Sequence, residues 1–136
     1  MSIRKKEDSL YPSDWIKVAK KDWHRAKGML DEDDAEAAGF FLQQSLEKYL
    51  KAFLLQQGWK LRKIHTLYTL LDEAIRYNLA LESFRELCER VSGYYFAERY
   101  PMLTEEELTC DEVKKDMKEA ERFIKIMFNE EEKIVY

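Results

Sequence analysis

The chain has 136 residues, 46% of them hydrophobic and 37% charged, which suits one soluble globular domain and excludes a two-domain enzyme or a disordered chain. Only four glycines and two prolines are present, about 4% of the residues where average usage is about 12%, so a turn-rich β-sandwich is disfavoured. The formal net charge of −4 excludes a surface that binds nucleic acid throughout, so any phosphate site must be local. An all-helical domain fits these numbers best.

Cysteine usage and the hydropathy pattern predict a cytoplasmic protein. Cys88 and Cys110 have no C-x-x-C spacing and no histidine at zinc-ligand intervals, so we expect two buried thiols in a reducing compartment. Residues 1–15 are charged and contain no apolar segment typical of a signal peptide, and nowhere do about 18 apolar residues run uninterrupted. Secretion and membrane spanning are therefore not expected.

The first half of the chain predicts two long helices. Apolar residues recur at helical spacing over 13–30, where Ser13 or Asp14 is expected to cap the helix. A second helix is predicted over 35–57, with Gly58 as its C-terminal stop. The apolar arc of this second helix is wider than a surface stripe, so we expect it to be the central helix of the fold.

The second half predicts three further helices. A short helix is expected over 67–78, followed by a longer one over 82–99, because Pro101 forces the chain out of helix soon afterwards. Thr109 and Glu112 stand at the spacing of a capping box before a fifth apolar stripe. Short connections favour antiparallel neighbours in such a chain.

These elements together predict an all-α fold, an up-and-down four-helix bundle with an additional short helix, five helices in total. The whole chain, 1–136, is expected to be one domain. Its core is expected over about 13–128, with terminal tails over 1–12 and 129–136.

Motifs for enzymatic chemistry are mostly missing from the sequence. It contains no G-x-x-x-x-G-K, G-x-G-x-x-G, G-x-S-x-G or H-E-x-x-H pattern. Of the two histidines, His24 is expected to face solvent. His65 stands at the start of the third helix beside Arg62 and Lys63, where cations and helix-terminal N–H groups could hold a phosphate. The favoured alternative is structural: the cations complement the C-terminal dipole of the second helix, and His65 caps the third.

A polar cluster on the second helix has two interpretations. Its members share one helix face by i, i+3 and i+4 spacing: Gln44, Glu47, Lys48 and Lys51. An amide, a carboxylate and two amines could bind a nucleotide, and ordinary Glu–Lys pairing on a helix surface explains the same residues.

The end of the fourth helix also carries a charge to be explained. Tyr95 and Arg99 are four residues apart and are expected on its inward face, so Arg99 needs a partner in the bundle. We favour an internal salt bridge to a carboxylate such as Asp22 over a phosphate or carboxylate of a ligand.

Three segments together carry a resemblance to a known family. The runs FLQQSLEKYLKAFLLQQG (41–58), KIHTLYTLL (63–71) and YYFAERYP (94–101) resemble the HEPN domain, a helical family named for nucleotide binding. The resemblance covers about 13–128 and includes the opening stretch with Trp15, Ala19, Asp22 and Trp23. It implies a four- or five-helix bundle that forms a homodimer and serves as the substrate-binding subunit of a small nucleotidyltransferase. Such pairs often behave as toxin–antitoxin modules.

Many members of this family are metal-independent ribonucleases that carry an arginine, four to six residues, and then a histidine on one helix. The sequence departs from that pattern. Only two residues separate Arg62 from His65, and the arginines of the fourth helix have no histidine downstream of them: Arg85, Arg90 and Arg99. RNA cleavage is therefore not expected.

The sequence thus predicts a nucleotide-binding accessory subunit, with ATP or another nucleoside triphosphate as ligand, a small nucleotidyltransferase as partner, and no metal or cofactor. Phosphate contacts are expected from Lys48, Lys51, Arg62, Lys63 and His65, and a stacking groove from Tyr94, Tyr95 and Arg99. The first alternative is a ribonuclease toxin that cleaves RNA with Arg62 and His65. The second is a dimerisation or protein-interaction module with exposed aromatics, Trp59 and Tyr68 among them.

Overall fold

The computed structural model describes residues 9–64, 66–100, 102 and 107–129, and the regular elements in these ranges are all helical. In chain order they are α1 (Pro12–Asp31), α2 (Ala35–Gln56), α3 (Leu67–Ile75), the 3₁₀ helix η2 (Leu79–Phe84), α4 (Arg85–Ser92), α5 (Tyr94–Arg99) and α6 (Cys110–Phe128). The predicted all-α class is confirmed. Within the described ranges, no helix is long and apolar enough to cross a membrane.

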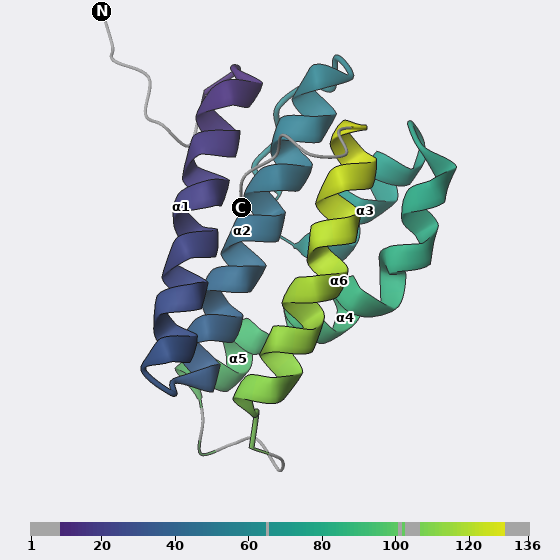
Figure 1. Ribbon diagram of the computed structural model, residues 1–136. Coiled ribbons are helices and arrows are strands. Elements are labelled where there is room, and N and C mark those ends of the chain that lie inside the picture. Colours follow the sequence, from purple (N-terminus) through teal and green to yellow (C-terminus); the bar gives the residue numbers. More distant parts are fainter. Residues whose placement is uncertain (1–8, 65, 101, 103–106, 130–136) are drawn as a thin grey trace, which may run out of the picture.

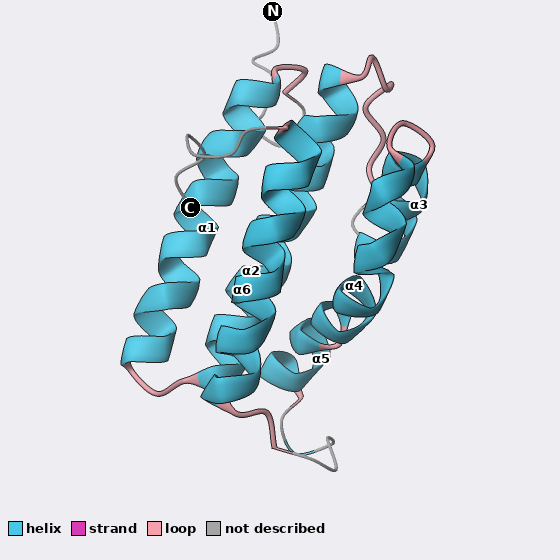
Figure 2. Ribbon diagram, turned by 45° about the vertical axis from the view of Figure 1, so that its right-hand side comes forward, coloured by secondary structure: helices cyan, strands magenta, loops and turns pink. Residues whose placement is uncertain are grey.

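The predicted central position of the second helix is confirmed, since α2 contacts α1, α3, α4, α5 and α6. Figure 1 shows α1 antiparallel to α2, and α6 running in the same direction as α2. Figure 2 shows α1 on one side of α2 and the α3–α5 segment on the other. α1 packs chiefly against α2, and the Ser45 hydroxyl donates to the Ala19 carbonyl across their contact at 2.8 Å.

Helix boundaries follow local signals, with one correction. Asp34 caps α2 by accepting from the Ala37 N–H at 3.1 Å, and Thr109 with Glu112 forms the predicted capping box of α6. The sequence suggested Ser13 or Asp14 as the cap of α1, but neither residue caps this helix. The helix begins at Pro12, which is accepted in the first turn because the N–H groups there have no partner within the helix.

The single helix expected over 82–99 is in fact divided into η2, α4 and α5. In η2 the buried residues Leu81 and Phe84 are three apart, and a 3₁₀ helix places such residues on one face. Gly93 then separates α4 from α5. Tyr94, three residues after Val91, lies in the core and Tyr95 is 39% exposed, so the expected inward orientation of Tyr95 is wrong.

Candidate functional site

The side chains predicted to bind a ligand lie in three separate parts of the fold. Lys48 and Lys51 lie in the contact between α1 and α2, which we call the α1–α2 seam. Arg62 and Lys63 lie on the connector between α2 and α3, and His65 lies outside the described residues. The third group is on α5: Tyr94, Tyr95 and Arg99.

Charges in the α1–α2 seam compensate each other. Lys51 is only 2% exposed; its ammonium lies 3.1 Å from the Glu47 carboxylate and 5.0 Å from the centre of the Trp15 ring. The ammonium of Lys48 donates to the Gln44 amide oxygen at 2.9 Å and lies 3.4 Å from the Asp22 carboxylate. Burial closes Lys51 off from a phosphate in solution, and the i, i+4 pairs favour the structural interpretation of this polar face.

The predicted salt bridge between Arg99 and Asp22 is wrong. The buried carboxylate of Asp22 accepts instead from Arg25, at 2.8 Å, and lies beside Lys48. Arg99 is exposed and lies on α5, where its guanidinium donates to the Tyr95 hydroxyl at 2.8 Å. Tyr94 and not Tyr95 is the buried position on this helix, so Arg99, four residues after Tyr95, lies with it on the exposed side.

On the connector, Arg62 lies 3.6 Å from Glu73 of α3, and Lys63 is exposed. This pairing ties the connector to α3 through a surface contact worth about 0–1 kcal/mol. Trp59 at the start of the connector is buried at 7% exposed, which corrects its assignment to an exposed partner surface. Tyr68 is 42% exposed, as that alternative required.

A row of rings and guanidinium groups runs from the end of α1 across the start of α2 to α5, and we call it the α5 strip. Arg25 lies 5.9 Å from the Phe41 ring, and Phe41 makes an edge contact with Phe40 at 5.3 Å. Phe40 then contacts Tyr95 at 5.8 Å, and Arg99 lies at the same distance over the Tyr95 ring. The strip thus joins three helices into one aromatic surface with a cation at each end.

Two further aromatic side chains continue this surface. Phe96 is 45% exposed and Tyr100 is 44% exposed, and their rings are 5.1 Å apart. An aromatic surface with flanking arginines is the composition that stacks planar rings and contacts phosphates.

A buried polar cluster anchors α5 beneath the strip. The Tyr94 hydroxyl donates to Asp116 of α6, and Arg90 of α4 donates to the same carboxylate at 3.1 and 3.2 Å. Burial raises the pKa of the Tyr94 phenol, and its bond to Asp116 raises it further, so this side chain stays a neutral donor. Tyr94 therefore positions α5 and does not itself line the exposed surface.

Gly39 of α2 makes room for Tyr94. A Cβ atom at Gly39 would lie 2.9 Å from Cγ of Tyr94, closer than real contacts allow. Four residues of this region were not predicted from the sequence to have a role in it: Gly39, Phe40, Arg90 and Asp116. A glycine inside a strongly helical pattern indicates the close approach of another element, so Gly39 was the one sequence signal for this contact.

The cysteines and acidic residues offer little reactive chemistry in the described part of the chain. Cys88 is buried, which raises the pKa of its thiol to about 12 and keeps it protonated. Cys110 is partly exposed, contrary to expectation, and its thiol donates to Asp33 at 3.4 Å. His24 is exposed on α1 as predicted. No group of three histidine, cysteine or carboxylate side chains that could hold a metal is found among the described residues.

Comparison with known proteins supplies the family. The search of curated proteins and that of solved structures found no match. The family model of the HEPN domain matches residues 12–133, which include all six α-helices described above. The chain therefore belongs to the HEPN domain family.

Proposed function

We propose that this HEPN protein binds a nucleotide, ATP or another nucleoside triphosphate, on the α5 strip and serves as a non-catalytic accessory subunit in the cytoplasm. The observation that carries the proposal is the exposed pair of Tyr95 and Arg99 beside Phe40. A base can stack on the aromatic rings while the guanidinium contacts a phosphate, and both interactions are favourable at a partly exposed surface.

The other cations of the predicted site are less suited to a phosphate. Lys51 is buried beside Glu47, and Arg62 is paired with Glu73. Arg99 by contrast bonds a neutral phenol and retains its full charge for a ligand. Lys63 is exposed, and with His65 it remains a candidate for a separate phosphate contact.

The protein partner in this proposal is a small nucleotidyltransferase, in a homodimeric and toxin–antitoxin-like arrangement, and the support is the family resemblance. Phe96 and Tyr100 supply exposed aromatic area next to the strip, which is the composition that protein interfaces favour. A nucleotide on the strip would then lie close to the partner that uses it.

Thermal unfolding with a panel of nucleoside triphosphates tests the site. At 100 times its dissociation constant, a ligand should stabilise the fold by about 2.7 kcal/mol. Tyr95→Ala and Arg99→Ala should abolish that shift. Tyr68→Ala is the matched control, because Tyr68 is also exposed and also lies under an arginine, with the guanidinium of Arg85 at 4.9 Å.

Two outcomes would contradict the site: no stabilisation by any nucleotide, or an equal shift in wild type and Tyr95→Ala. The partner is tested separately, by coexpression with a small nucleotidyltransferase encoded beside this chain and size-exclusion chromatography. RNA cleavage in EDTA that Arg62→Ala abolishes would favour the ribonuclease alternative instead.

A further inference from the structure

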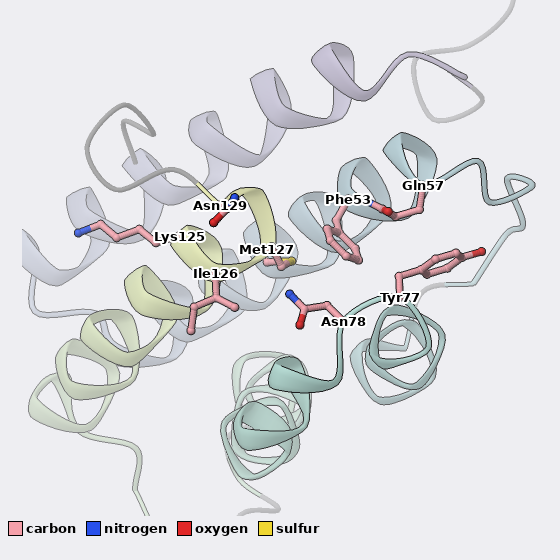
Figure 3. Close-up of a pocket in the computed structure, with 8 residues that line it drawn as sticks. All are labelled: Phe53, Gln57, Tyr77, Asn78, Lys125, Ile126, Met127 and Asn129. Carbon is pink, nitrogen blue, oxygen red and sulfur yellow. The ribbon is translucent and has the colours of Figure 1, made fainter.

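A second candidate site lies at the other end of the bundle from α5. The cavity has a volume of about 650 Å³, which lies within the range of about 300–1,000 Å³ for small-molecule sites. It opens between the C-terminal ends of α2 and α6 and the turn that follows α3 (Figure 3). The α5 strip does not contribute to it, so the two sites can be tested independently.

The electrostatics of this cavity disfavour an anion. α2, α3 and α6 all end beside it, and the last carbonyl groups of a helix carry partial negative charge. No carboxylate lines it among the described residues. Lys125 is the charged residue of the lining, and Figure 3 shows its ammonium pointing away from the other side chains. A phosphate would meet carbonyl groups here without a facing cation.

The polar side chains of the cavity are carboxamides. Gln57, Asn78 and Asn129 each offer donors and an acceptor without a net charge. The Oδ1 atom of Asn78 accepts from the Ala80 N–H at 3.0 Å, which fixes the orientation of that amide. Its nitrogen therefore faces the cavity, and Figure 3 shows it directed toward Met127.

Apolar atoms complete the lining. Phe53 and Met127 form a wall beside the amides, and both belong to the hydrophobic core. An aromatic ring and a thioether beside three carboxamides suit a flat ligand with hydrogen-bonding edges, because Asn and Gln pair with the donor–acceptor edges of bases.

We propose that this cavity binds an uncharged planar heterocycle with adjacent N–H and carbonyl groups, the chemistry of a nucleobase or nucleoside, and discriminates against its phosphorylated form. The ligand donates to helix-terminal carbonyls and accepts from the Asn78 amide. The inference does not rest on nucleotide binding at the α5 strip.

The test compares each of the four common ribonucleosides with its 5′-monophosphate by isothermal titration calorimetry. It uses the Tyr95→Ala protein, so that the α5 strip does not contribute. A nucleoside should bind, and its monophosphate should bind at least tenfold more weakly. Equal binding of the two, or no binding by any nucleoside, would overturn the proposal.

Two variants test the location of the site while keeping the structural role of the residue that each one changes. Asn78→Asp keeps the acceptor for the Ala80 N–H and loses the donor, and Asn129→Gly keeps a residue suited to the left-handed conformation at φ 49°. Each should weaken nucleoside binding at least tenfold, whereas Lys125→Gln should change it less than twofold. Unchanged affinity in both amide variants, with circular dichroism showing them folded, would also overturn the proposal.

Discussion

The α1–α2 seam and the α5 strip contain the same chemical pair, a cation over an aromatic ring, in opposite surroundings. In the seam, the ammonium of Lys51 lies 5.0 Å from Trp15 and both side chains are buried. On the strip, the guanidinium of Arg99 lies 5.8 Å from Tyr95 and both are exposed. A buried pair contributes to the fold, and an exposed pair can exchange its water for a ligand. Burial therefore decides which of the two pairs is accessible to a ligand, although the residue types are alike.

Breaking the seam should have the largest effect on stability. Lys51→Ala leaves the buried Glu47 carboxylate less compensated and should lower the free energy of unfolding by about 3–5 kcal/mol. Urea unfolding followed by circular dichroism measures this loss. The double variant Glu47→Gln with Lys51→Met should recover more than half of it, because it removes both charges.

Lys63→Ala provides the exposed control for that experiment and should change stability by less than about 0.5 kcal/mol. If Lys51→Ala cost no more than Lys63→Ala, the seam would be hydrated in solution and the comparison would fail.

Two glycines test the attachment of the strip. Gly39→Ala forces a Cβ against Tyr94 and should cost about 1–3 kcal/mol in spite of the better helix propensity of alanine. Gly28→Ala, in α1, meets nothing within 4 Å and should instead stabilise the protein by about 0.5–1 kcal/mol. Thermal unfolding of both variants would show opposite signs. A stabilising Gly39→Ala would mean that α5 does not pack closely on α2.

The smallest expected changes in stability come from removing one hydroxyl group on either face of α5. Tyr94→Phe removes the donor to the buried Asp116 carboxylate and should cost about 1–2 kcal/mol. Tyr95→Phe removes an exposed hydroxyl and should stay within about 0.5 kcal/mol. Chemical denaturation of both variants measures the difference, and equal losses would place the two hydroxyl groups in similar environments.

The sequence predicted the helices well where a local signal was strong. The Thr109–Glu112 capping box and the wide apolar arc of α2 both act within a few turns of one helix, so their outcome needs no knowledge of neighbours. Gly58, at φ 88°, likewise adopts the left-handed conformation expected just after a helix.

The candidate site was harder to predict because it depends on which helices pack against each other in the folded chain. Lys51 belongs to a polar stripe in the sequence, and only the packing of Trp15 against it makes that stripe internal. Tyr94 and Tyr95 stand three and four residues after Val91, so the helical period allows either to be buried, and only the space that Gly39 leaves on α2 selects Tyr94. The α5 strip joins residues from three helices, so its continuity exists only in three dimensions.

The central place of α2 has a consequence for how the molecule opens. Because α2 contacts five other helices, its amide hydrogens should exchange with solvent only through global unfolding. α5 has six residues and should open subglobally, at a lower free energy. Hydrogen–deuterium exchange can therefore report occupancy of the strip as slowed exchange in α5 alone, while the rate in α2 records the stability of the whole domain.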